Sequence, residues 1–136
     1  MILEKLRKLK DEEKKIDLVK ELIDRLEFCK KAIENDSCLM QLKMMDKEYE
    51  KLLKKVRPLE IDNIYKLKDD ARELVLPYKE KIKKLSKSDF IDTIDLCIKN
   101  TKLKGITTEN IMEFYMIIYS LCVFYDISKT DLKDMR

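Results

Sequence analysis

Apolar residues in the first third of the chain recur at the spacing of a coiled-coil helix. Two series of apolar positions repeat every seven residues and are offset by three, so they fall on one stripe of a long helix. The stripe covers about four heptads and predicts a helix over residues 2–33. We expect its central members to form a contact surface with a protein partner: Leu9, Ile16, Val19, Ile23, Leu26 and Ile33.

A second amphipathic helix is predicted over residues 38–57, after a polar break at residues 34–37 in which Asn35 can adopt the left-handed conformation. Pro58 then ends or redirects the chain. Two long helices joined by a short turn predict an antiparallel, coiled-coil-like hairpin over residues 2–57. The apolar stripe of the second helix is Leu42, Met45, Tyr49, Leu52, Leu53 and Val56.

The rest of the chain, residues 58–136, is predicted to form a C-terminal helical group. A helical pattern runs over residues 59–85, and Pro77 predicts a kink or break near Leu76 because proline disfavours helix at the preceding residue. Ser86 is placed to cap the next helix.

The helix predicted over residues 108–125 is apolar on nearly every side, which is typical of a buried central helix. Gly105 marks the turn before it, and Thr107 is the expected N-cap. With that cap, Ile106 and Ile111 occupy the two positions of a hydrophobic staple.

Composition agrees with these patterns and indicates one all-α domain over residues 1–136. Hydrophobic residues make up 45% of the chain, which is enough for a core, and there are only one glycine and two prolines. Sheets need far more turn-forming residues than this. We therefore predict an antiparallel helical bundle with a long N-terminal hairpin.

Several classes of chemistry are excluded by residue type. The chain contains no histidine, so it has no Ser-His-Asp triad, no Cys-His pair and no H-E-x-x-H site. The four cysteines have no C-x-x-C spacing. Carboxylates on facing helices are the remaining metal ligands, and solvated acidic faces explain them better: Glu21 with Asp24, Glu109 with Glu113, and the series Asp89, Asp92 and Asp95. We predict no catalytic residue, no metal and no cofactor.

Lysine clusters offer an alternative function. If the fold gathers them on one side, they form a patch that contacts a phosphate backbone without reading sequence. The basic majority is lysine, which lacks the planar fork of arginine, and the net charge is only +3. The candidate nucleic-acid residues are Lys54, Lys55, Arg57, Lys81, Lys83, Lys84, Lys87, Lys102 and Lys104.

The function favoured by the sequence is a non-enzymatic interaction or assembly subunit that associates with a protein partner or with itself. A heptad stripe together with a helix apolar on all faces is more apolar surface than a compact monomer needs. No uncharged stretch approaches membrane-spanning length, and the sequence starts without a signal-peptide pattern. We expect an intracellular, cytoplasmic protein with reduced thiols and no membrane partner.

Overall fold

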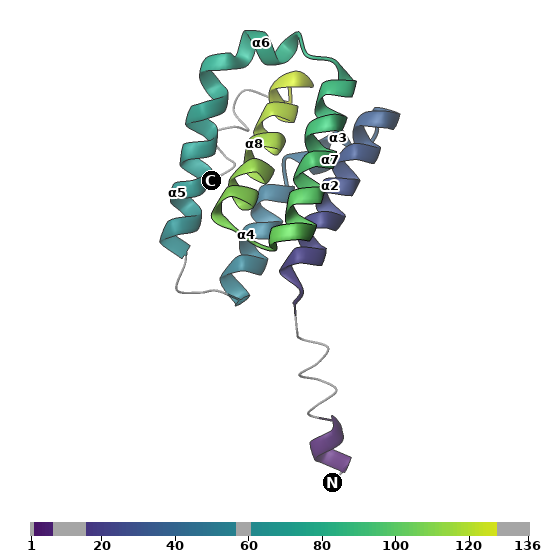
Figure 1. Ribbon diagram of the computed structural model, residues 1–136, viewed down its shortest axis with the longest axis vertical. Coiled ribbons are helices and arrows are strands. Elements are labelled where there is room, and N and C mark those ends of the chain that lie inside the picture. Colours follow the sequence, from purple (N-terminus) through teal and green to yellow (C-terminus); the bar gives the residue numbers. More distant parts are fainter. Residues whose placement is uncertain (1, 7–15, 57–60, 128–136) are drawn as a thin grey trace.

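Regular structure in this chain is helical wherever it is described. The computed structural model describes residues 2–6, 16–56 and 61–127, and within these ranges it contains helices and no strands. After a short helical segment at residues 2–6, the elements are α2 (Leu18–Asn35), α3 (Leu39–Leu42), α4 (Met45–Val56), α5 (Ile61–Val75), a 3-10 turn η2 (Leu76–Tyr78), α6 (Lys79–Lys83), α7 (Lys87–Lys104) and α8 (Thr108–Phe124) (Figure 1). The all-α prediction is confirmed.

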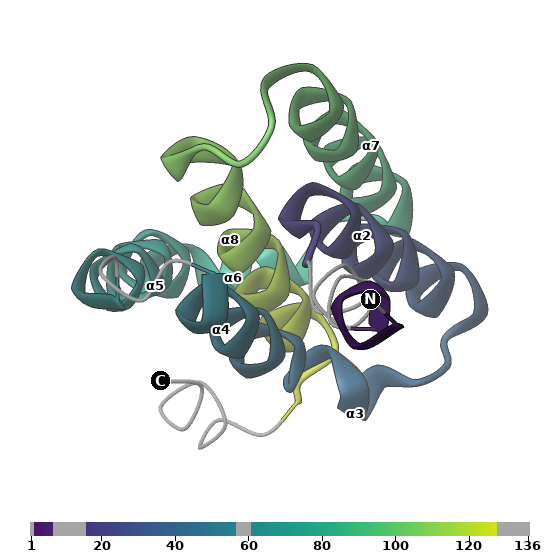
Figure 2. The same cartoon turned by 90° about the horizontal axis from the view of Figure 1, so that it is seen from below.

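Helix α8 lies at the centre of an antiparallel bundle. Figure 2, which looks along the bundle, shows α8 in the middle, with α5 to one side and α7 with α2 to the other. Side chains from all sides of α8 are buried, as expected for a helix that is apolar nearly all round. The buried side chains of the surrounding helices join those of α8 in one contiguous core.

The first long helix predicted from the heptads is interrupted. Residues 16–17 are not helical, and α2 begins at Leu18. Asp17 has an extended backbone, and its side chain accepts hydrogen bonds from the N–H groups of Val19 and Lys20, at 3.1 and 3.2 Å. This is an N-cap, so a continuous helix over residues 2–33 was a wrong prediction. The left-handed residue that ends α2 is Asp36 rather than Asn35.

The second predicted helix is also divided, at residues 43–44, into α3 and α4. Helix α2 packs mainly against α7, and its contact with α3 and α4 is smaller. The structure therefore does not show the predicted hairpin of two long helices. The heptad-spaced side chains of α2 are buried in a core shared by several helices, because α2 contacts α7, α4 and α3 rather than one long hairpin partner.

Local signals in the second half of the chain are confirmed. The helix breaks at η2, one residue before Pro77. Ser86 caps α7, since its Oγ accepts from the N–H of Asp89 at 3.2 Å while Asp89 accepts from the N–H of Ser86 at 2.9 Å. Thr107 caps α8 through the N–H of Asn110 at 3.1 Å. Gly105 ends α7 with a φ of 75°, a conformation that glycine adopts without strain.

No helix in the described ranges is both long enough and apolar enough to span a bilayer.

The cysteines differ sharply in accessibility. Cys29, Cys97 and Cys122 are buried, whereas Cys38 is exposed between α2 and α3. Burial raises the pKa of the Cys29 and Cys97 thiols to about 12, which leaves little of the reactive thiolate at neutral pH. The buried thiols therefore behave as small apolar side chains.

We expect one thiol to react quickly with Ellman's reagent in the native protein and the other three only after unfolding in guanidinium. The fast reaction should disappear in Cys38→Ser, because Cys38 is the exposed cysteine. Rapid reaction of two or more thiols before unfolding would contradict the packing of α2 on α7.

Candidate functional site

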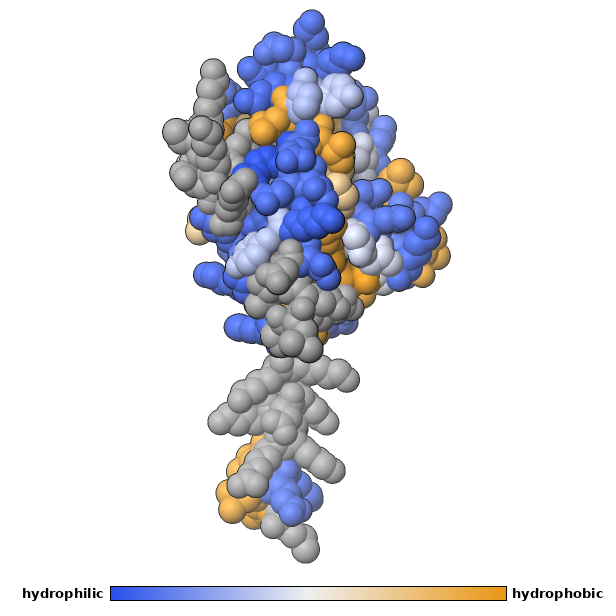
Figure 3. Space-filling view, turned by 90° about the vertical axis from the view of Figure 1, so that its left-hand side faces the viewer, coloured by the Kyte–Doolittle hydropathy of each residue, from blue (hydrophilic) through white to orange (hydrophobic). Residues whose placement is uncertain are grey.

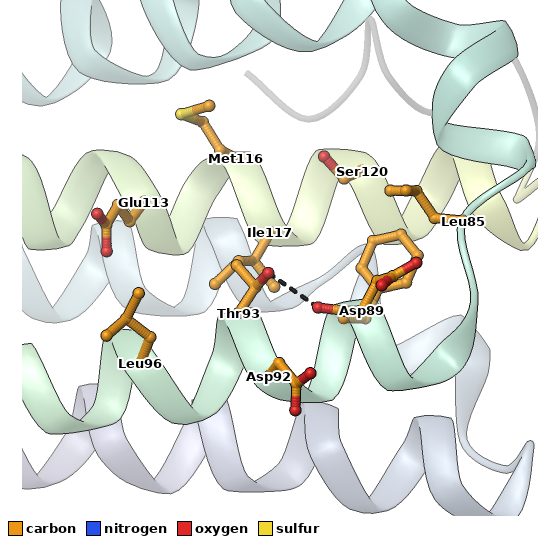
Figure 4. A pocket seen from close by; sticks show the side chains of 10 residues that line it. Leu85, Asp89, Asp92, Thr93, Leu96, Glu113, Met116, Ile117 and Ser120 are labelled. Atoms are coloured by element: carbon orange, nitrogen blue, oxygen red, sulfur yellow. Dashed lines mark hydrogen bonds between the residues drawn. The ribbon is translucent and has the colours of Figure 1, made fainter.

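An open groove runs between α7 and α8. Both helices line it with positions spaced i, i+3, i+4 and i+7, the spacing of one helix face. Helix α7 contributes Asp89, Asp92, Thr93 and Leu96. Helix α8 contributes Glu113, Met116, Ile117 and Ser120, and Leu85 and Phe90 complete the lining. Figure 4 shows Glu113 and Leu96 at one end of the groove and Leu85 and Asp89 at the other.

The groove has the volume of a binding site. Its cavity volume is about 630 Å³, within the range of about 300–1,000 Å³ that is usual for ligand pockets. Leu96 projects from α7 with 57% of its surface exposed, and Leu85 is also exposed. Because these leucines are exposed, the groove offers apolar surface that a partner can bury.

The groove is open because the surrounding helices do not cover all of α8. Most of its side chains are buried, but Met112, Met116 and Ser120 are only partly buried, and Glu113 is exposed. These positions form one stripe along the helix. The uncovered stripe is therefore mixed, with Met112 and Met116 as its apolar members and Glu113 and Ser120 as its polar ones.

The rim of the groove is acidic. Asp89, Asp92 and Glu113 lie among its lining residues, which include no lysine or arginine in the part of the chain that the structure describes. The hydrogen bond from the backbone N–H of Ser86 lowers the pKa of Asp89 and keeps it ionised. Thr93 donates its hydroxyl to the backbone oxygen of Asp89 at 2.9 Å, so it is already occupied as a donor. The groove thus combines an apolar floor with negative charge.

A smaller hollow lies between α2 and the α3–α4 region, with a cavity volume of about 460 Å³. Arg25 lines it and is already paired with Glu21 at 2.6 Å and with Glu48 at 3.9 Å. Met44 is an exposed member of this lining, whereas Met45 is in the core. The α7–α8 groove is larger and carries the excess negative charge, so it is the stronger candidate.

A buried ionic cluster joins α4 and α5 and lies next to α8. Lys68 is only 1% exposed. Its Nζ lies 3.1 Å from Oδ2 of Asp46 and 3.4 Å from Oε1 of Glu50. The same Nζ is 5.8 Å from the ring centroid of Tyr115 on α8, a cation–π distance. Buried charges are tolerated only when they are paired, so these contacts fix how the helices pack.

Burial dominates the electrostatics of this cluster. It raises the pKa of Asp46, in opposition to the attraction of Lys68. It also raises the pKa of the Tyr115 and Tyr119 hydroxyls, which remain protonated. Neither hydroxyl has a hydrogen-bond partner in the described part of the chain. With its charges paired internally, the cluster acts as a structural element of the bundle.

Sequence reasoning missed this cluster, although α5 contains a signal for it. Lys68 falls on the same helix face as the buried residues Ile64, Ala71 and Val75, at spacings of four, three and seven. A lysine within an apolar stripe predicts a buried cation that needs an acidic partner. On α4, Asp46 and Glu50 directly follow the core residues Met45 and Tyr49.

The predicted interaction stripe is largely part of the intramolecular core. Leu26 and Ile33 have no exposed surface, so their assignment to a contact surface is corrected. Ile16 and Ile23 are partly buried against the core, and Val19 is partly buried too. Leu9 lies outside the described residues. The leucines that do face solvent beside the groove, Leu85 and Leu96, were not predicted.

The candidate nucleic-acid residues do not form one patch. Lys81 and Lys83 lie on α6, Lys84 follows it, and Lys87 begins α7. Lys102 and Lys104 end α7, about 22 Å further along at the usual helical rise. Lys54 and Lys55 end α4, at the end of the bundle opposite α6 (Figure 1), and Arg57 is outside the described residues.

Several of these lysines are also engaged. Lys87 pairs with Asp36. Lys54 lies 3.5 Å from Glu50 and 5.0 Å from the ring centroid of Tyr65. The lysines are divided between the two ends of the bundle, since α4 and α7 both end on the side opposite α6 (Figure 1). Contact with a phosphate backbone stays a prediction.

Metal ligands do not gather in the part of the chain that the structure describes: no group of three or more cysteine, aspartate or glutamate side chains is placed to hold an ion. Of the aspartate series on α7, Asp95 pairs with Lys30 at 3.0 Å and Asp89 serves as a cap.

No protein-family model, curated protein or solved structure matches this chain.

Proposed function

We propose that this chain is a non-enzymatic interaction or assembly subunit that binds an amphipathic helix in the groove between α7 and α8. The observation that carries the proposal is an open apolar groove of about 630 Å³, with Leu96 and Leu85 exposed beside it. Binding of a helix in an apolar groove between helices is a recurring mode of recognition.

The dimensions of the groove fit about two turns of helix. From Glu113 to Ser120, α8 rises by about 10 Å, and the lining of α7 is similar in length. A helical partner that presents apolar side chains at i, i+3 or i+4, and i+7 places them along this floor. Burying each leucine-sized side chain contributes about 1.5–3 kcal/mol, from which the cost of ordering both partners is subtracted.

The acidic rim selects the charge of the partner. Asp89, Asp92 and Glu113 favour an occupant with lysine or arginine beside its apolar face, and they repel acidic segments and phosphate backbones. Among the partners expected from the sequence, this favours a protein segment, including one from another copy of the chain, over nucleic acid.

Sedimentation equilibrium at micromolar concentration tests the proposal for self-association. We expect the wild type to associate and Leu96→Glu to be monomeric, because a charge in the groove must be desolvated without a partner. Leu74→Glu is the matched control, since Leu74 is an exposed leucine on α5, at 49% against 57% for Leu96, and is not among the groove residues. It should associate like the wild type. A wild-type protein that stays monomeric, or Leu96→Glu that associates normally, would refute self-association through this groove.

A further inference from the structure

The short helical segment at residues 2–6 exposes its apolar side chains. Leu6 is 55% exposed, and Ile2 and Leu3 are exposed still further. Figure 3 shows this segment at one end of the molecule, with hydrophobic surface on one side and hydrophilic surface on the other. A helical turn with three exposed large apolar residues gains free energy when a partner covers them.

A short basic stretch follows this segment, and the acidic residues Asp11, Glu12 and Glu13 come directly after it. Between residues 2 and 10 the sequence contains four basic residues, Lys5, Arg7, Lys8 and Lys10, and one acidic residue, Glu4, so its net charge is 4 − 1 = +3. The apolar positions Ile2, Leu6 and Leu9 are spaced i, i+4 and i+7. This spacing equals that of the groove positions Glu113, Ile117 and Ser120 on α8.

We propose that residues 2–10 of one copy bind, in helical form, in the α7–α8 groove of a second copy. Ile2, Leu6 and Leu9 lie on the apolar floor, beside Leu96 and Met116. The basic residues of the segment face Asp89, Asp92 and Glu113, the three acidic side chains among the described residues of the lining. This inference rests on the proposed function of the groove and names its occupant.

Each copy supplies one segment and one groove, so the contact is made between two different surfaces. A two-fold arrangement satisfies both grooves in a closed dimer, because each segment then occupies the groove of the other copy. Because the contact joins opposite charges near the surface, raising the salt concentration from about 0.1 to about 1 M should weaken it, as the Debye length falls from about 10 to about 3 Å.

The experiment compares two full-length variants and their mixture by sedimentation. Leu6→Glu disables the segment, and Leu96→Glu disables the groove. Each alone should associate at least about tenfold more weakly than the wild type, since each loses the burial of a leucine. Both side chains are more than half exposed, so an unchanged circular dichroism spectrum should show that folding is retained. Glu4→Gln, which removes the acid of the segment, is the matched control and should associate at least as well as the wild type.

Mixing the two variants decides the identity of the occupant. Every mixed pair keeps one intact segment and one intact groove, so the mixture should associate where neither variant does alone. If Leu96→Glu is monomeric while Leu6→Glu associates normally, the groove is the contact surface but the segment is not its occupant, and only this inference is overturned. If neither substitution changes association, the groove proposal fails as well. A wild-type monomer that binds anionic phospholipid vesicles through Leu6 would also overturn it.

Discussion

Replacing Lys68 with methionine is expected to destabilise the fold by about 3–5 kcal/mol, the usual cost of removing one partner from a buried ion pair. Lys68 is almost fully buried and contacts both Asp46 and Glu50. Its removal takes the paired cation from buried Asp46 and one of two lysine partners from Glu50, which keeps Lys54 at 3.5 Å, while methionine retains most of the side-chain volume. Urea unfolding followed by circular dichroism measures the difference.

The expected pH dependence of this loss follows from the buried acids. Burial raises the pKa of Asp46, so its carboxyl group binds a proton more tightly in the folded state than in the unfolded state. The folded state therefore loses stability as the pH rises from the unfolded pKa of Asp46 through its higher folded pKa. Without Lys68 the penalty for ionising Asp46 increases. The Lys68→Met loss should therefore be largest at neutral pH and smallest below about pH 4, where carboxyl groups are protonated.

Lys66→Met is the matched control, because Lys66 is an exposed lysine on the same helix. It should change stability by no more than about 0.5 kcal/mol. A loss of stability below about 1 kcal/mol for Lys68→Met, or a loss that does not vary with pH, would show that water hydrates the charged groups of the cluster. Replacing all three ionic side chains by apolar residues should recover much of the stability.

Shortening Leu121 to alanine is expected to destabilise the fold by about 2–5 kcal/mol through loss of burial and formation of a cavity. Leu121 lies on α8 and has no exposed surface. The surrounding helices hold α8 on most sides, which limits how far the site can collapse. Guanidinium unfolding of the two proteins gives the difference in free energy.

Leu103→Ala makes the same chemical change on α7, where Leu103 is 73% exposed. Its effect should stay within about 0.5 kcal/mol. A loss below about 1 kcal/mol for Leu121→Ala would mean that the centre of the bundle is loosely packed, contrary to the burial of its side chains.

The elements that could be predicted from the sequence are those encoded within a few residues. Ser86 and Thr107 both cap helices as expected, and the chain breaks beside Pro77, because these signals depend on local backbone chemistry. The central place of α8 was also predictable, since a helix that is apolar on every side has to be enclosed.

The prediction of one continuous first helix was wrong for a physical reason. The heptad count weighed only the apolar positions, and it passed over Asp17, whose carboxylate competes for the N–H groups of the next turn. The same count assigned Leu26 and Ile33 to a partner, although both side chains are buried in the core of the bundle. Periodicity shows which face of a helix is buried but not which neighbour buries it.

The groove itself could not be predicted from local pattern. Leu96 and Met116 belong to helical stripes like those of the core residues Ile94 and Ile117. Their exposure depends on where α2, α5 and α7 dock around α8, which is set by packing over the whole chain. Lys68 could be predicted in part. The sequence shows its position in an apolar stripe of α5, but it does not show that its acidic partners lie on α4.

The cap at Asp17 separates two tasks along the chain. Because α2 begins with its first N–H groups satisfied by Asp17, the bundle does not need the preceding residues to complete its own hydrogen bonding. Ile16 still packs partly against the core, whereas the side chains of residues 2–6 are exposed. Substitutions at residues 2–6 are therefore expected to leave the free energy of unfolding of the bundle nearly unchanged. Under the contact proposed above, the bundle and the segment that it binds can diverge independently in evolution, so a duplicated copy acquires a new partner by altering only the exposed residues of that segment.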